Sequence, residues 1–391
     1  MKEWQKLVLI ISVFLAAYYI PFEQQLVKES IIESFLMLQE YAREHVLFCL
    51  IPALFIAGAI ANFISQGAVI KYFGGGAHKA LAYSVASVSG SVLAVCSCTV
   101  LPLFTGIYKR GAGLGPAVAF LYSGPAINIL AIILTARVLG WQLGAARALG
   151  AVLFSVIIGL IMAFLYRREE AERCEGSFAG VGDDEEEKRG PAKTLLYFLV
   201  LVLILVFAAW SKPEAVGGLW YQIFQIKWFL VAFLLLLLGY MVWRWFDKEE
   251  RSSWVASTWE FSQQILPLLF AGVLVAGLLM GRPESDAGLI PARYIEALVG
   301  GNSFQANLVA SVLGAFMYFA TLTEVPILQG LLGAGMGKGP ALALLLAGPA
   351  LSLPNMLVIR SVLGTKKTMV FVALVAIMAT IAGMIFGYIA G

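Results

Sequence analysis

Two cysteines separated by a single serine stand inside an apolar stretch, AVCSCTVLP at residues 94–102. In a continuous helix, side chains two residues apart point about 200° away from each other and cannot share a ligand. Pro102 would also remove the helical donor to the carbonyl of Cys98. Two interpretations follow: Cys96 and Cys98 are small packing residues on opposite helix faces, or the helix is interrupted and both thiols face one cavity.

A carboxylate is the second group that could do chemistry, in TLTEVP at residues 321–326. Glu324 lies within an apolar segment, and ionisable residues inside a membrane are costly and usually functional. No Lys or Arg lies within one helical turn of Glu324 along its own segment. We therefore expect a carboxyl that is protonated near neutral pH and couples a proton. The alternative is a structural carboxyl that is hydrogen-bonded at a helix start.

The composition places these groups in a membrane. The chain has 391 residues, of which 60% are hydrophobic and 13% charged, whereas soluble domains are about 45–50% apolar. The net charge of +3 lies mostly in loops and does not indicate a nucleic-acid partner. Four cysteines do not suggest a disulfide framework, and no metal-ligand cluster, phosphate-binding loop or catalytic triad is evident. We expect no enzyme, metal or cofactor, and as partners the lipid bilayer and a small molecule or ion, with a homo-oligomer as an open alternative.

Apolar segments near the roughly 20 residues of a bilayer span recur along the sequence. The first follows Lys2 and Lys6 and lacks a good cleavage site, so we interpret it as an uncleaved helix rather than a signal peptide. The segments fall near residues 7–20, 45–66, 79–108, 113–139, 144–166, 193–210, 223–246, 260–280, 303–332, 338–361 and 367–390.

The chain repeats itself with an offset of 224 positions. Glycines, prolines and two Gly-Pro-Ala motifs match in one ungapped frame, and such internal duplication is typical of secondary transporters. The matched pairs are Gly90 and Gly314, Pro102 and Pro326, Gly106 and Gly330, 115–117 and 339–341, 124–126 and 348–350, and Gly140 and Gly364. The expected organisation is a first helix and connector (1–44), repeat 1 (45–166), a charged flexible linker (167–192), two connecting helices (193–259) and repeat 2 (260–391).

Segments 79–108 and 303–332 are unusually long for single spans, about 45 Å each as one helix against a core of about 30 Å. If each is a re-entrant hairpin, most Lys and Arg fall on the cytoplasmic side and the two repeats are inverted. A long tilted helix is the alternative. The predicted fold is therefore an all-α polytopic membrane protein with two homologous, inverted repeats whose broken, re-entrant helices meet near the bilayer midplane.

The candidate site lies at the two hairpin tips and at the Gly-Pro-Ala breaks that follow them. Thr99 could cap the second arm of the first hairpin, with Pro102 in its first turn. Pro125 and Pro349 each free a carbonyl, and polar residues follow both; the alternative for the small residues is close helix packing. Candidate substrate-binding residues are Cys96, Ser97, Cys98, Thr99, Asn128, Thr321, Thr323, Ser352 and Asn355, and candidate helix-breaking residues are Pro102, Gly124, Pro125, Pro326, Gly348 and Pro349.

The stretch CSCTVLPLFTGIYKRGAGLGPAVAFLYSGPAIN at 96–128 resembles the signature of the predicted-permease family that includes the ArsP-like organoarsenical exporters. The resemblance spans residues 45–390 and implies a permease of a prokaryotic cytoplasmic membrane. For the exporting members it implies efflux of trivalent organoarsenicals. It carries over to Cys96, Cys98, Pro102, Gly124, Pro125 and Asn128. The second repeat departs from this pattern because it has no thiol.

The leading hypothesis is a multi-pass permease that exports a thiophilic solute by alternating access, with the N-terminus and the linker in the cytoplasm. Helix starts aimed at the midplane would also suit a small oxyanion or a sulfur-containing anion. A thiol-redox membrane protein that uses the Cys-Ser-Cys pair, or a scaffold without transport, are further alternatives. The sequence determines neither the transported molecule nor the direction of transport.

Overall fold

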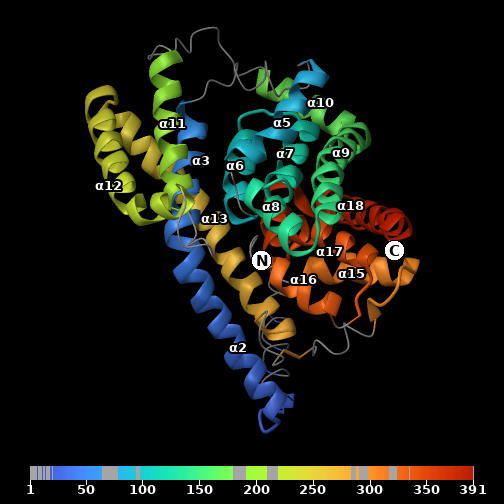
Figure 1. The fold of residues 1–391 in the computed structure, drawn as a ribbon. Coiled ribbons are helices and arrows are strands. Elements are labelled where there is room, and N and C mark those ends of the chain that lie inside the picture. The colour runs from blue at the N-terminus through green and yellow to red at the C-terminus, as the bar shows by residue number, and fades with distance from the viewer. Residues whose placement is uncertain are drawn as a thin grey trace.

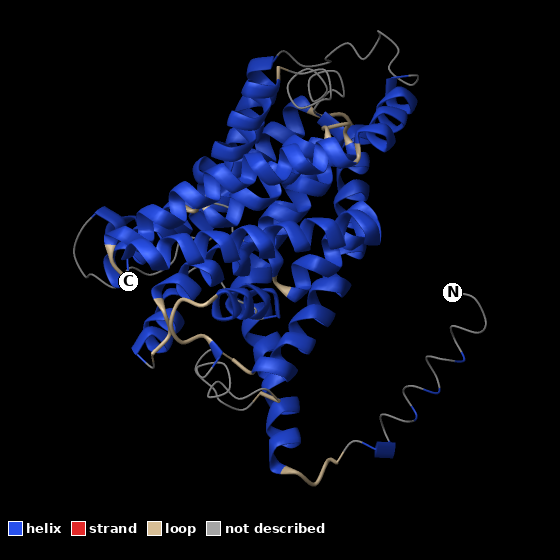
Figure 2. Cartoon of the chain, turned by 90° about the vertical axis from the view of Figure 1, so that its right-hand side faces the viewer, coloured by secondary structure: helices blue, strands red, loops and turns tan. Residues whose placement is uncertain are grey.

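The structure is a computed structural model, and it describes most of the chain. The described residues are 21–63, 78–93, 97–178, 191–208, 219–282, 288–289, 298–316, 324–333 and 335–390, together with 7, 11, 14, 18 and 19. Helix dominates them (Figure 2). The predicted all-α class is confirmed.

The first half of the chain contains four short described helices of 10 to 15 residues, which lie between the helical run 25–63 and a helix of 25 residues. Its helices are α2 (Gln25–Tyr41), the π-helix η1 (Ala42–Leu50), α3 (Ile51–Phe63), α5 (Lys79–Leu93), α6 (Ser97–Lys109), α7 (Leu114–Ala126), α8 (Ile129–Val138), α9 (Trp141–Leu165) and α10 (Arg167–Phe178).

The second half follows a similar pattern after two connecting helices. Its helices are α11 (Pro191–Ala208), α12 (Leu219–Trp245), α13 (Lys248–Met280), α15 (Phe304–Phe316), α16 (Glu324–Gly333), α17 (Lys338–Leu351) and α18 (Leu353–Ala390). Helix α18 contains a break at Gly364, where φ is +80°.

Several of the described helices can cross a bilayer. Five are long and apolar enough, and α7 with α8 would make a sixth span although the two are bent by 45°. Helix α12 exposes bulky apolar side chains such as Phe229 and Leu236, which are 79% and 76% exposed. Apolar surface of this kind is compatible with lipid, so the chain is a multi-pass membrane protein.

Two groups of helices pack against each other to form the body of the molecule (Figure 1). Helices α5, α7 and α9 form one group, and α15, α17 and α18 form the other. Helices α7 and α9 contact α17, and α9 also contacts α18. At this junction the Tyr122 hydroxyl donates to the carbonyl of Leu346 at 3.2 Å, between positions that are 224 residues apart.

Glycines allow the helices of each group to approach closely. A Cβ atom on Gly115 of α7 would lie 2.9 Å from the carbonyl oxygen of Gly159 of α9. A Cβ atom on Gly339 of α17 would lie 2.6 Å from the carbonyl oxygen of Gly383 of α18. The two contacts are related by the offset of 224 found in the sequence. The duplication and the inversion of the repeats both stay predictions.

The two long apolar segments are each divided between two described helices. In segment 79–108, α5 ends at Leu93 and α6 begins at Ser97. In segment 303–332, α15 ends at Phe316 and α16 begins at Glu324. The residues between them, 94–96 and 317–323, lie outside the described part of the chain, and the re-entrant course of both segments stays a prediction.

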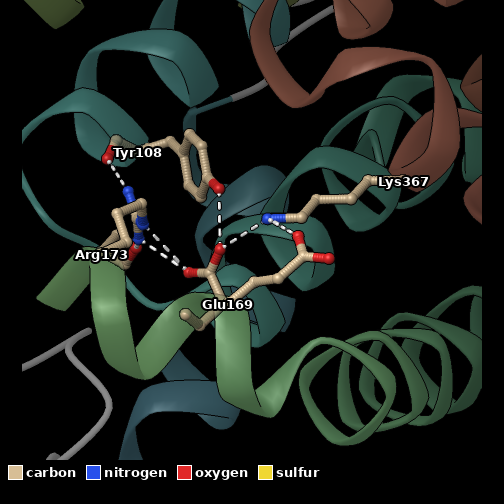
Figure 3. A network of polar contacts seen from close by, with 6 residues as sticks. Tyr108, Glu169, Arg173 and Lys367 are labelled. Carbon is tan, nitrogen blue, oxygen red and sulfur yellow. Dashed lines mark hydrogen bonds and ion pairs between the residues drawn. The ribbon is translucent and has the colours of Figure 1, made fainter.

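The charged segment 167–192, expected to be flexible, begins with a helix. Helix α10 occupies residues 167–178, whereas 179–190 lie outside the described residues. Bonds from other helices fix α10: the Glu170 carboxylate accepts hydrogen bonds from the Tyr108 hydroxyl at 2.9 Å and from Lys367 Nζ at 3.0 Å. Within α10, Arg173 Nε donates to Glu170 at 3.1 Å. Figure 3 shows Tyr108, Arg173 and Lys367 close together at this helix. Lys367 also pairs with Glu169 at 3.3 Å. Helix α10 is therefore bonded to the end of α6 and to α18.

Candidate functional site

Both Gly-Pro-Ala motifs stand at the ends of helices. Helix α7 ends at Ala126, one residue past Pro125, and Asn128 lies between α7 and α8. Helix α17 ends at Leu351, and Ser352 leaves helical geometry with φ −47° and ψ 146°. The two interruptions therefore fall at equivalent places in the two halves, and both are buried in protein. Interrupted backbone within a bilayer needs such protein surroundings.

Long side chains bond to the carbonyls at these helix ends. Arg147 Nε of α9 donates to the carbonyl of Ala126 at 3.4 Å. In the other half, Asn355 Nδ2 donates to the carbonyl of Pro349 at 3.2 Å. The last carbonyls of a helix lack helical donors, so these contacts reduce the cost of ending a helix inside the membrane.

A buried ion pair lies next to the first of these breaks. The guanidinium of Arg147 on α9 contacts the carboxylate of Glu324, the first residue of α16, and neither side chain has any exposed surface. Arg147 Nη1 also donates to the Thr135 hydroxyl of α8 at 3.0 Å. One arginine thus connects the end of α7, the middle of α8 and the start of α16.

The electrostatics of Glu324 depend on this contact. Among the residues that the structure describes, Arg147 supplies the polar contact to the Glu324 carboxyl. No hydrogen-bond donor among them reaches Glu324 Oε2. The start of α16 adds the partial positive charge of a helix N-terminus. A buried charge without a partner is strongly destabilising, so Arg147 and Glu324 are each required to offset the cost of burying the other.

This pair reveals a residue that the sequence interpretation missed. The sequence interpretation considered cations only along the segment of Glu324 itself, where none lies within one helical turn, whereas Arg147 reaches the carboxylate from α9. Arg147 stands 177 positions away in the sequence, where no local pattern links it to Glu324. The usable signal was a lone arginine inside the apolar segment 144–166, the same signal that identified Glu324.

The remaining candidate residues are only partly described. Thr99 is buried and is the third residue of the described helix α6 rather than its cap. Asn128, Ser352 and Asn355 are also buried. The side-chain oxygens of Ser352 and Asn355 have no hydrogen-bond partner within the described residues. Gly348 approaches α15 closely, since a Cβ atom on Gly314 would lie 3.1 Å from its nitrogen.

Some of the other candidates lie outside the described residues, and the rest lie within helices. Cys96, Thr321 and Thr323 lie outside the described residues, as do the side chains of Ser97, Cys98 and Pro326. Pro102 lies within α6, Pro125 within α7 and Pro349 within α17. Gly124 is buried in α7, next to Pro125. The structure therefore places Glu324 beside Arg147, and the two thiols lie outside the described side chains.

Comparison with known proteins adds the family. The model of the predicted-permease family ArsP_1 matches residues 31–388. UPF0718 protein MJ0584 of Methanocaldococcus jannaschii is 43% identical over 353 residues, which cover 90% of this chain and 94% of that protein. UPF0718 protein YraQ of Escherichia coli is 24% identical over 289 residues, covering 74% of this chain and 63% of that protein. No solved structure shows significant similarity. The chain, with its broken helices and buried charge pair, belongs to the predicted-permease family.

Proposed function

We propose that this chain is a secondary permease that exports a thiophilic small solute, such as a trivalent organoarsenical, by alternating access. The observation that carries the permease mechanism is the ionisable Glu324, fully buried at the start of α16 and held by Arg147 of the other helix group. Such groups inside a membrane mark ion and proton pathways. The site lies where interrupted helices from both halves come together, the usual position of a transporter binding site.

Glu324 is the proposed proton carrier. In one state the carboxylate binds a proton from one side of the membrane, and in the other state it releases that proton to the opposite side. Proton entry would thereby drive solute export. Replacement of Glu324 by Gln keeps the shape of the side chain and removes its titration, so we expect the variant to bind solute but to lose pH-dependent transport.

The thiophilic substrate rests on the Cys-Ser-Cys motif and on the family. One residue separates Cys96 from Cys98, so both thiols would reach one arsenic atom if the backbone is unwound there. Soft thiolate ligands suit thiophilic elements. Family membership is shown over most of the chain, and the substrate is part of the proposal. We further propose the cytoplasmic membrane of a prokaryote as its location, with the N-terminus and residues 167–192 in the cytoplasm.

A small anion is the second candidate substrate, and Arg147 favours it. A guanidinium inside the membrane can bind carboxylates and oxyanions in a bidentate manner. In this case the anion would replace Glu324 as the partner of Arg147 after Glu324 takes up a proton. The charge pair is compatible with both candidates, whereas the thiol pair favours the first.

A ligand-induced thermal-shift experiment separates the two substrates. Purified protein that lacks the two other cysteines (Cys49→Ala with Cys174→Ala) is heated with phenylarsine oxide, with sulfate or with thiosulfate. The proposal predicts stabilisation by the arsenical alone, and its loss in Cys96→Ser and Cys98→Ser. Stabilisation by an anion that persists in both serine variants would replace the thiophilic substrate with the anion.

A further inference from the structure

We propose that Arg147 is the positioning residue that keeps Glu324 ionised in the arrangement seen here, so that protonation of Glu324 breaks a contact between the two halves of the molecule. The inference rests on the proposed function, because it assigns a control element to the same carboxylate. Nothing in the family assignment gives Arg147 a role.

The pair of Arg147 and Glu324 has no counterpart at the corresponding positions of the other half of the molecule. At the offset of 224, the counterpart of Arg147 is Phe371 and that of Glu324 is Val100, while Thr135 corresponds to Ile359. Phe371 and Ile359 have no exposed surface and Val100 is 1% exposed. The corresponding positions at this offset are thus filled by buried apolar side chains. A buried ion pair is therefore not needed to build this part of the fold, and well-packed apolar residues are often at least as stable.

The ion pair links helices of the two halves, which move relative to each other in the proposed alternating access. Arg147 belongs to α9 of the first half and Glu324 to α16 of the second. One turn further along α9, a Cβ atom on Gly150 would lie 3.2 Å from the Leu346 side chain of α17, so the two halves are in contact there. A movement that separates the two halves at this contact would lengthen the ion pair. Loss of the charge on Glu324 removes most of the attraction that opposes this movement.

The other charged side chains on the neighbouring helices are remote from the Glu324 carboxylate. The elements that pack against α16 are α8 and α17, with α9 supplying Arg147. Arg137 at the end of α8 and Lys338 at the start of α17 are exposed. Tyr122 on α7 lies close enough to interact electrostatically with Arg147 and is neutral at ordinary pH. Among the described residues, the charge of Glu324 is therefore controlled by Arg147.

Infrared spectroscopy tests this assignment directly, without any substrate. The carboxylic C=O stretch of Glu324 is isolated by subtracting the spectrum of the matched Glu324→Gln variant. At pH 7 we expect no Glu324 band in the wild type or in Arg147→Lys, which keeps the positive charge. We expect a band in Arg147→Gln, because the isolated carboxyl stays protonated. Phe371→Leu perturbs the equivalent apolar position of the other half and should leave the wild-type spectrum unchanged.

Transport measured against pH supplies the second readout. Uptake of phenylarsine oxide into proteoliposomes should depend on pH in the wild type, and in Arg147→Gln the profile should move by at least one pH unit toward alkaline pH. A Glu324 band in the wild type at pH 7, or a profile in Arg147→Gln equal to the wild type, would overturn the role of Arg147 and leave the proposed function intact. A pH profile that Glu324→Gln leaves unchanged would instead remove the proposed function itself.

Discussion

A double-mutant cycle at Arg147 and Glu324 measures how strongly the two buried charges depend on each other. Each residue is replaced by Met alone and then both together, since Met adapts to irregular buried space. Arg147→Met forces the buried Glu324 carboxyl to take up a proton, and Glu324→Met leaves the buried guanidinium charged without its partner, because both side chains are completely buried in the protein. Removing one partner of such a pair costs about 3–5 kcal/mol of unfolding free energy.

The double variant should behave differently from the sum of the two single variants. It removes both charges, and Thr135 keeps its own bond to the carbonyl of Ala131 at 2.6 Å. The remaining cost comes from the carbonyl of Ala126, which loses its hydrogen bond from Arg147. Leaving this carbonyl unpaired lowers the unfolding free energy by about 1–3 kcal/mol. We therefore expect the double variant to be more stable than either single variant, with a coupling free energy of at least about 3 kcal/mol.

The assay measures unfolding of the purified protein in bicelles, either by reversible denaturation or with a steric trap. The yield of folded protein checks that each variant folds. The matched control is Arg360→Met, because Arg360 is exposed and bonds to Thr365 at the surface. This control should change the stability by less than about 1 kcal/mol. Additive costs in the double variant would refute the argument, since they would mean that each charge is stabilised independently of the other.

Two further predictions concern packing and the anchoring of α10. Gly383→Ala should lower the unfolding free energy by about 1–3 kcal/mol, because its Cβ would lie 2.7 Å from the carbonyl oxygen of Gly339; Gly239→Ala, in open space on α12, should cost nothing in the same unfolding assay. Equal costs would contradict the close approach of α17 and α18. Glu170→Ala should release α10 and speed trypsin cleavage near its arginines several-fold, because Glu170 accepts the hydrogen bonds from Tyr108 of α6 and Lys367 of α18; exposed Glu172→Ala is the control, and equal cleavage rates would show that the network does not hold the helix.

Much of the architecture could be predicted because its signals are local. The apolar segments predicted membrane helices, and the paired Gly-Pro-Ala motifs predicted interruptions that the helices α7, α8, α17 and α18 display. Proline removes a helical hydrogen bond whatever its surroundings. The internal offset of 224 also reappears in the glycine contacts between helices.

The rest depends on contacts between distant positions. The charge run at 167–178 has the composition of a flexible linker, yet it is helical because Tyr108 and Lys367 bond to it from α6 and α18. Arg147 was visible as an arginine in an apolar segment, but its partner lies on another segment in the second half. Neither pairing has a local signature in the sequence. Sequence patterns alone therefore predict the charged groups but not which of them contact each other.

The most direct test of the central claim is solute transport driven by a proton gradient in proteoliposomes that contain only the purified protein. The account predicts that an imposed pH gradient drives accumulation of phenylarsine oxide, and that Glu324→Gln binds the solute but abolishes its gradient-driven accumulation. Empty liposomes and the Glu172→Ala variant define the background and the active control. Accumulation that is equally fast in Glu324→Gln, or no accumulation above empty liposomes in the wild type, would contradict the account.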